Sequence, residues 1–205
     1  QAEEREGERE SVCVCVCVMS LQHLNVFCGS RDPCVEMQEA ARELGTLMAQ
    51  QGIRLVYGGG SVGLMGTISR AVDTAGGQVL GVITHALKPV ELSGECIGEV
   101  LVVDTLSERK QLMSDNSDAF VALPGGLGTA DELFEVFSWL KLGYINKPVA
   151  VLNTCGFYDS LLDFLKRCVA ENFMSQVDLD MLIVASTPED LLQAITKKIE
   201  DTKSE

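Results

Sequence analysis

Residues 119–132 of the chain, AFVALPGGLGTADE, are its most informative stretch. An apolar run at 119–123 leads into a glycine-rich turn, and an amphipathic helical pattern follows it at 130–142. Glycines let a ligand approach the backbone closely, and the first turn of a helix offers free N–H groups. The stretch therefore predicts a strand, a turn and a helix that hold an anion such as a phosphate. Glu132 is expected in the first helical turn, beside that anion.

The same alternation of short apolar runs and helical patterns continues along the chain from about residue 22. Predicted strands are 22–28, 53–57, 78–83, 100–103, 119–123, 148–152 and 182–185. Predicted helices are 35–50, 61–75, 107–116, 130–142, 157–172 and 188–200. Such alternation with short connections is typical of a parallel sheet covered on both faces. The predicted fold is a single-domain, Rossmann-like, doubly wound α/β fold with ligands at the carboxyl ends of its strands.

The predicted domain spans residues 22–200 and is flanked by segments of different composition. Residues 1–21 combine an acidic start, expected to be disordered, with a run in which three cysteines alternate with valine. Residues 201–205 form a polar tail. The acidic start does not resemble an organelle transit peptide, which is rich in arginine and poor in acidic residues.

Composition excludes several classes of partner. The net charge of −14 disfavours a nucleic-acid polymer, because such a partner needs basic patches. No apolar run approaches the roughly 20 residues of a membrane-spanning helix, so no membrane partner is expected. The eight cysteines lack Cys-x-x-Cys spacing and a histidine cluster, so no metal site is predicted. Four of them lie in apolar runs and are expected to be buried, reduced thiols of a cytoplasmic protein: Cys28, Cys96, Cys155 and Cys168.

A second glycine loop follows the predicted strand at 53–57. It contains Gly58-x-Gly60-x-x-Gly63, the spacing of the dinucleotide-binding fingerprint. That fingerprint also needs an acidic residue at the end of the next strand, where this chain has Thr84. No Lys-Ser or Lys-Thr pair follows the glycines, so a Walker A loop is absent as well. The glycines either serve tight packing between strand and helix or form one wall of a mononucleotide site.

Two candidate features also have purely structural interpretations. Thr129-x-x-Glu132 matches a capping box, in which both side chains satisfy N–H groups at a helix start. Arg109 and Lys110 follow the predicted strand at 100–103, so they reach the rim where the glycine loops lie. Arginine can hold a phosphate or sugar oxygen through two parallel hydrogen bonds. Otherwise the two cations belong to a solvated helix start and pair with neighbouring charges.

Together these residues resemble the Lonely Guy family of cytokinin-activating phosphoribohydrolases. The resemblance covers residues 22–200 and rests on the segments 26–30, 55–66, 91–95, 108–110 and 124–132. It implies hydrolysis of the N-glycosidic bond of N6-modified adenosine 5′-monophosphates, which releases the free cytokinin base and ribose 5-phosphate. No cofactor is implied. The resemblance also implies a homodimer with active sites near the subunit interface.

Site residues follow from the same resemblance. Arg109 and Glu132 match the catalytic pair, with Glu132 expected to stabilise the positive charge that develops on the ribose. The turn at 125–129 is expected to anchor the 5′-phosphate. The predicted substrate-binding residues are Gly29, Ser30, Gly59, Gly60, Glu91, Lys110, Gly125, Gly126, Leu127, Gly128, Thr129 and Ser138. Sequences of this kind are sometimes labelled lysine decarboxylases, but no lysine stands in a recognisable pyridoxal phosphate setting.

The chain departs from plant members of the family at positions that bear on the N6 substituent. Leu106-Ser107 replaces Met-His, and Arg31-Asp32-Pro33 replaces a serine-rich turn. The hydrolytic pair is intact. Two other functions stay open at this point. One is a carrier of the molybdenum cofactor type, which binds a ligand without turnover, and the other is a nucleosidase that also accepts plain AMP.

Overall fold

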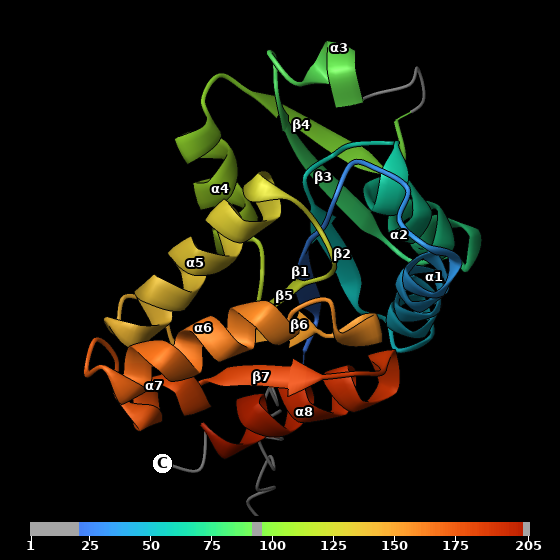
Figure 1. Ribbon diagram of the computed structural model, residues 1–205. Helices are drawn as coiled ribbons and strands as arrows, with labels where there is room; N and C mark the ends of the chain where they lie inside the picture. The colour runs from blue at the N-terminus through green and yellow to red at the C-terminus, as the bar shows by residue number, and fades with distance from the viewer. Residues whose placement is uncertain (1–20, 92–95, 203–205) are drawn as a thin grey trace, which may run out of the picture.

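The computed structural model describes residues 21–91 and 96–202, which form a parallel sheet between two layers of helices (Figure 1). The predicted extension, including its cysteine and valine run, lies outside the described residues except for Leu21. The strands are β1 (His23–Phe27), β2 (Arg54–Tyr57), β3 (Val79–Thr84), β4 (Glu99–Val103), β5 (Ala119–Ala122), β6 (Val149–Leu152) and β7 (Leu182–Ala185). They pair in the order β4-β3-β2-β1-β5-β6-β7, and every pairing is parallel. The predicted fold class is confirmed.

Helices cover both faces of the sheet. The long helices are α1 (Val35–Gln50), α2 (Gly63–Thr74), α4 (Leu106–Asp115), α5 (Leu127–Lys141), α6 (Asp159–Ala170) and α8 (Pro188–Asp201). One apolar core joins the sheet to α1, α2 and α8, and a second joins its other face to α4, α5 and α6. Figure 1 shows α1 and α2 on one side of the sheet and α4 and α5 on the other.

Strand β1 shows how a central strand contributes side chains to both cores. Leu24 and Val26 enter the first core, whereas Phe27 enters the second, because successive side chains of a strand point to opposite faces. Since helices cover both faces, neither set of side chains meets water. Strand order reverses between β1 and β5, and this switch point places the loops that follow both strands at one edge of the sheet.

The main differences from the predicted elements lie at helix starts and in short elements. Helix α5 begins at Leu127, three residues before the predicted start, and α2 begins at Gly63 rather than at residue 61. Glycines weaken the helical pattern at both places. The sequence did not predict α3 (Lys88–Glu91), α7 (Gln176–Asp180) or the 3₁₀ turn η1 (Thr154–Gly156). These elements are too short to show a hydrophobic period. No helix among the described residues is long and apolar enough to cross a membrane.

The expectation that four cysteines are buried is correct for Cys28 only. Cys96 and Cys155 are exposed, and Cys168 is half-buried. Cys155 lies in η1, beyond the end of β6, and Cys96 precedes β4, so neither occupies the strand interior that its apolar neighbours suggested.

Asn25, in the middle of β1, gives a stability prediction. Its side chain is fully buried, and neither its amide nitrogen nor its amide oxygen has a hydrogen-bond partner among the described residues. Its neighbours in register on β2 and β5 are Val56 and Phe120. We expect Asn25→Leu to raise the free energy of unfolding by about 1–3 kcal/mol, because it removes a desolvated amide without changing the shape much.

Urea denaturation measures this effect, with Asn153→Leu as the matched control. The Asn153 side chain donates to Asp159 and accepts from the Tyr158 N–H, so its loss should destabilise the protein. If both variants are destabilised to the same degree, the amide of Asn25 is not an uncompensated polar group.

Candidate active site

A cavity of about 240 Å³ lies at the carboxyl edge of the sheet, across the switch point between β1 and β5. The loops after β1 and β2 form part of its wall, and the first turns of α5 close another side. Eight of the predicted site residues line it: Gly29, Ser30, Arg109, Gly126, Leu127, Gly128, Thr129 and Glu132. The fold thus brings together residues from three separate motifs of the sequence.

The start of α5 supplies backbone donors to this cavity. Gly126 is the N-cap residue in an extended conformation (φ −97°, ψ −151°), and as a glycine it has no side chain that could cap the helix. The first N–H groups of a helix have no partner within it, so those of Leu127, Gly128 and Thr129 can bind an anion. The positive end of the 15-residue helix dipole adds to this preference.

The capping-box interpretation of Thr129 and Glu132 is wrong. Thr129 is not the N-cap residue but lies within the helix, and it is almost fully buried. Its hydroxyl lies close to Gly125, where a Cβ atom would come within 2.1 Å of Thr129 Oγ1. Glu132 is therefore one full turn into the helix, with its carboxylate on the cavity side.

The loops after β1 and β5 interlock through glycines. The Gly29 N–H donates to the Pro124 carbonyl at 3.1 Å, and a Cβ atom on Gly29 would lie 3.3 Å from Gly125 Cα. Tyr158 holds the same turn from behind, because its buried hydroxyl donates to the Leu123 carbonyl at 2.6 Å. Burial also raises the pKa of Tyr158, so this hydroxyl keeps its proton and its hydrogen bond. The backbone of the glycine turn is thus fixed on both sides.

Arg109 is the cation of the cavity. It is 8% exposed, and its Nε donates to the Val82 carbonyl at 2.9 Å. Its Nη2 donates to the Gly58 carbonyl at 3.3 Å and lies 3.8 Å from Glu132 Oε1. The interpretation as a solvated helix start is therefore wrong for Arg109. Two backbone carbonyls fix the guanidinium, which leaves its other N–H groups available to a ligand.

Gly58 also lines the cavity, although the sequence suggested it only as part of the glycine fingerprint and not among the binding residues. A Cβ atom at this position would lie 2.1 Å from Arg109 Nη2, so only glycine leaves room for the guanidinium. The sequence did indicate a position near the site, because Gly58 is the first residue after β2 and therefore lies at the rim of the sheet. Met65, on the first turns of α2, also lines the cavity, but helical periodicity alone gave no reason to select it.

Five other predicted binding residues do not line this cavity: Gly59, Gly60, Lys110, Gly125 and Ser138. Gly125 lines a neighbouring cavity, whereas Gly59, Gly60 and Ser138 line neither of the two. Glu91 ends the short helix α3. The Lys110 ammonium instead pairs with Asp131 at 3.1 Å and with Glu135 at 3.0 Å. Burial disfavours its charge, but the hydrogen bonds to these two carboxylates outweigh burial and raise the pKa of Lys110.

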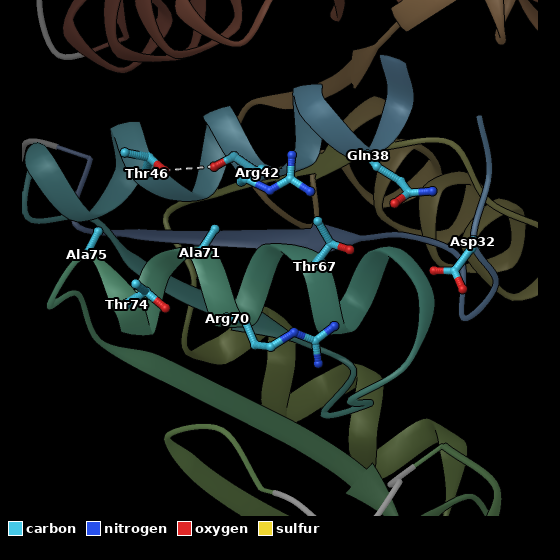
Figure 2. A pocket seen from close by; sticks show the side chains of 9 residues that line it. All are labelled: Asp32, Gln38, Arg42, Thr46, Thr67, Arg70, Ala71, Thr74 and Ala75. Atoms are coloured by element: carbon cyan, nitrogen blue, oxygen red, sulfur yellow. Dashed lines mark hydrogen bonds between the residues drawn. The ribbon is translucent and has the colours of Figure 1, made fainter. Parts of the chain in front are cut away.

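Two further cavities lie nearby. One, of about 300 Å³, adjoins the glycine turn and shares Gly29, Ser30 and Gly126 with the site, and Pro33 and Phe157 form part of its wall. A larger one, of about 570 Å³, lies in the groove between α1 and α2, where Arg42 and Arg70 project from facing helices (Figure 2). That groove contains none of the predicted site residues and no glycine turn at a strand end, so its size does not make it the catalytic site.

The doubly wound parallel sheet, with a glycine turn at its switch point, defines a Rossmann-like protein. A family model described as "Possible lysine decarboxylase" matches residues 65–195. The chain is 48% identical over 182 residues to the cytokinin riboside 5′-monophosphate phosphoribohydrolase LOG1 of Arabidopsis thaliana, covering 88% of this chain and 84% of that protein. The probable phosphoribohydrolase LOGL6 of Oryza sativa is 44% identical over 192 residues, or 93% of this chain and 77% of that protein. The chain therefore belongs to the Lonely Guy family.

Solved structures agree on the fold. The molybdenum cofactor carrier protein of Chlamydomonas reinhardtii superposes with a TM-score of 0.64 at 26% identity, over 88% of this chain and 99% of that protein. The molybdenum cofactor binding protein of Rippkaea orientalis gives a TM-score of 0.65 at 23% identity, over 88% of this chain and 99% of that protein. The second similarity supports the fold alone.

Proposed function

We propose that the chain hydrolyses the N-glycosidic bond of N6-modified adenosine 5′-monophosphates and releases the free cytokinin base and ribose 5-phosphate. The observation that carries the proposal is the pair Arg109 and Glu132 in one cavity with the free N–H groups of α5. The relatives named as cytokinin riboside 5′-monophosphate phosphoribohydrolases support it. The proposal assigns the activity to residues 22–200 and requires no metal or cofactor.

The phosphate end of the substrate would bind at the start of α5. The N–H groups of Leu127, Gly128 and Thr129 can donate to the phosphate oxygens, and Gly125 and Gly126 let these oxygens approach the backbone. Binding energy from this remote group orients the sugar without taking part in the bond cleavage. Because a net charge of −14 repels a phosphate at long range, this local cluster of donors has to supply the attraction.

The sugar would lie against Arg109 and Glu132. Cleavage of the C1′–N9 bond develops positive charge on the ribose, and the nearby Glu132 carboxylate would stabilise that charge electrostatically. Water then adds to C1′ as a hydroxyl group, and its other proton goes to the departing base. Arg109, fixed by the carbonyls of Val82 and Gly58, would hold the substrate between the phosphate and the ribose.

The test is product analysis with three substrates: isopentenyladenosine 5′-monophosphate, AMP and isopentenyladenosine. We expect the free base and ribose 5-phosphate from the first, much less product from AMP, and none from the riboside, because it lacks the phosphate. Equal rates with AMP would indicate a nucleosidase of broad specificity. Tight nucleotide binding without any release of base would contradict hydrolysis.

A ligand carrier is the second candidate, and the similarity to the carrier protein of Chlamydomonas reinhardtii favours it. A carrier needs the anion-binding turn but not a carboxylate opposite an arginine. The Arg109–Glu132 pair therefore favours the enzyme. Binding of molybdenum cofactor by the purified chain, together with inactivity on all three nucleotide substrates, would support the carrier.

We also propose that the chain forms a homodimer and resides in the cytoplasm. Leu106, Leu127 and Phe134, on α4 and α5 close to the cavity, are exposed, and a second subunit would cover such apolar side chains. The cysteines of the described residues are all free thiols, as is typical of a reducing compartment. Light scattering after gel filtration tests the dimer, and fractionation of cells that produce the full protein tests the location.

A further inference from the structure

The groove between α1 and α2 is built from one face of each helix. Its lining residues recur at intervals of three or four along both helices, so each set lies on the same side of its helix. The helices touch at Gly45, where a Cβ atom would lie 2.9 Å from Ala71 Cβ. The groove encloses about 570 Å³, which is within the range of roughly 300–1,000 Å³ for small-molecule sites. Its lining side chains are Gln38, Arg42 and Thr46 on α1 and Thr67, Arg70, Ala71, Thr74 and Ala75 on α2, with Asp32 from the loop before α1.

Two arginines without a carboxylate partner supply the charge of this groove. Arg54, Arg109 and Arg167 each pair with a glutamate, whereas Arg42 and Arg70 form no ion pair among the described residues. The chain as a whole carries a net charge of −14, so carboxylates are plentiful and these two arginines nevertheless face a cavity instead. Guanidinium groups bind phosphates through charge-assisted hydrogen bonds. The groove therefore favours a negatively charged ligand.

The protein itself holds Arg70 in place. The Arg70 Nη1 donates to the Ser61 carbonyl at 3.0 Å, and a Cβ atom on Gly66 would lie 2.8 Å from its Nη2. Figure 2 shows the Arg70 and Arg42 side chains extending along the groove in the same direction, with Thr67 between them. A guanidinium has five N–H donors, so both arginines keep donors for an anion that lies between the two helices.

The threonines of the groove present hydrogen-bond acceptors to a ligand. Thr46 Oγ1 donates to the Arg42 carbonyl at 2.9 Å, and Thr67 Oγ1 donates to the Gly63 carbonyl at 3.1 Å. A hydroxyl has a single proton, so both threonine oxygens can only accept from a ligand. The Gln38 amide nitrogen likewise donates to a backbone carbonyl, at 2.9 Å, and its amide oxygen remains an acceptor. These acceptors suit the hydroxyl groups of a ligand, whereas the arginines suit its phosphate.

We propose that the groove between α1 and α2 is a second ligand site, which binds a phosphorylated sugar or polyol. The phosphate lies against Arg42 and Arg70, and the hydroxyl groups of the ligand donate to Thr46 and Thr67. The Asp32 carboxylate, at the Gln38 end of the groove, is a further acceptor for hydroxyl groups and repels a second phosphate. None of the groove residues lines the 240 Å³ cavity, so this site does not depend on the proposed hydrolase function.

The test titrates the isotope-labelled full chain with glucose 6-phosphate and follows the backbone amide signals by NMR. We expect saturable shifts at the groove residues of α1 and α2, with a Kd about 10-fold lower than that for inorganic phosphate, because the sugar hydroxyls add hydrogen bonds. Succinate, an anion without hydroxyl groups, should bind more weakly than glucose 6-phosphate. The amide signals of residues 127–129 report separately on the proposed phosphate site at α5, so failure of either proposal is seen independently of the other.

Matched variants connect the shifts to the two arginines. Arg42→Gln and Arg70→Gln should each raise the Kd for glucose 6-phosphate by about 10-fold or more, because each removes charge-assisted hydrogen bonds. Arg42→Gln leaves the contact between Arg70 and Ser61 intact, so it tests the site even if Arg70→Gln disturbs the fold. Arg167→Gln is the control, because Arg167 is an exposed arginine of α6 that pairs with Glu171, and its loss should leave the Kd unchanged.

Three results would overturn the proposal. The first is the absence of shifts in the groove when glucose 6-phosphate is added. The second is binding of inorganic phosphate or succinate as tight as that of the sugar phosphate, because the threonine acceptors would then have no role. The third is an unchanged Kd in a folded Arg42→Gln variant, because the groove would then not hold the phosphate through its arginines.

Discussion

Replacing Glu132 with glutamine is expected to lower kcat for isopentenyladenosine 5′-monophosphate by at least about 100-fold, whereas nucleotide binding changes little. Glutamine keeps the shape of the side chain and removes only its charge. The carboxylate is 12% exposed and lies 3.8 Å from Arg109, so water screens it weakly. Loss of one preorganised electrostatic group in a catalytic site typically costs about 100- to 1,000-fold in kcat.

The measurement pairs steady-state kinetics with the Kd for a nucleotide that is not cleaved. Asp131→Asn is the matched control. Asp131 directly precedes Glu132 on the helix, but its side chain is 65% exposed and pairs with Lys110. The control should keep nearly normal kcat. Glu132 is not the charge-stabilising group if Glu132→Gln, with the fold intact, hydrolyses the substrate as fast as the parent protein does.

The central strands and long helices could be predicted because burial on both faces leaves an unambiguous trace. Residues 119–123 and 148–152 contain no charged side chain, and a parallel strand within a covered sheet requires this. Helix starts were harder to predict. The start of α5 was placed after Gly128, although that glycine is helical, because glycine at a helix start and glycine in a turn look alike in a sequence. The buried Asn25 left no signal, since its neighbours alone indicate a strand.

The site could be predicted in its parts but not in its geometry. The sequence places Arg109 and Lys110 side by side, and residues that are adjacent on a helix point about 100° apart. Only the packing of α4 decides that Arg109 enters the cavity and that Lys110 turns to the outer face of α5.

Replacing Arg109 with lysine is expected to lower kcat/KM by about 100-fold or more, even though the positive charge is kept. Arg109 donates from Nε to Val82 and from Nη2 to Gly58, and the same guanidinium faces Glu132. A lysine has a single ammonium group and cannot reproduce this planar arrangement of donors. At least one buried carbonyl would lose its partner, and the remaining charge would move relative to Glu132.

Arg54→Lys is the matched control for the exchange. Arg54 begins β2, at the opposite edge of the sheet from the cavity, and pairs with Glu99 near the surface. The Arg54→Lys variant should keep normal kcat/KM, so that any general cost of replacing arginine by lysine is measured separately. Because loss of a buried hydrogen bond also destabilises the fold, Tm is measured for both variants, and kinetics are compared well below the lower value. A folded Arg109→Lys enzyme with nearly normal kcat/KM would mean that Arg109 contributes charge alone, and the positioning role assigned to its two carbonyl contacts would be wrong.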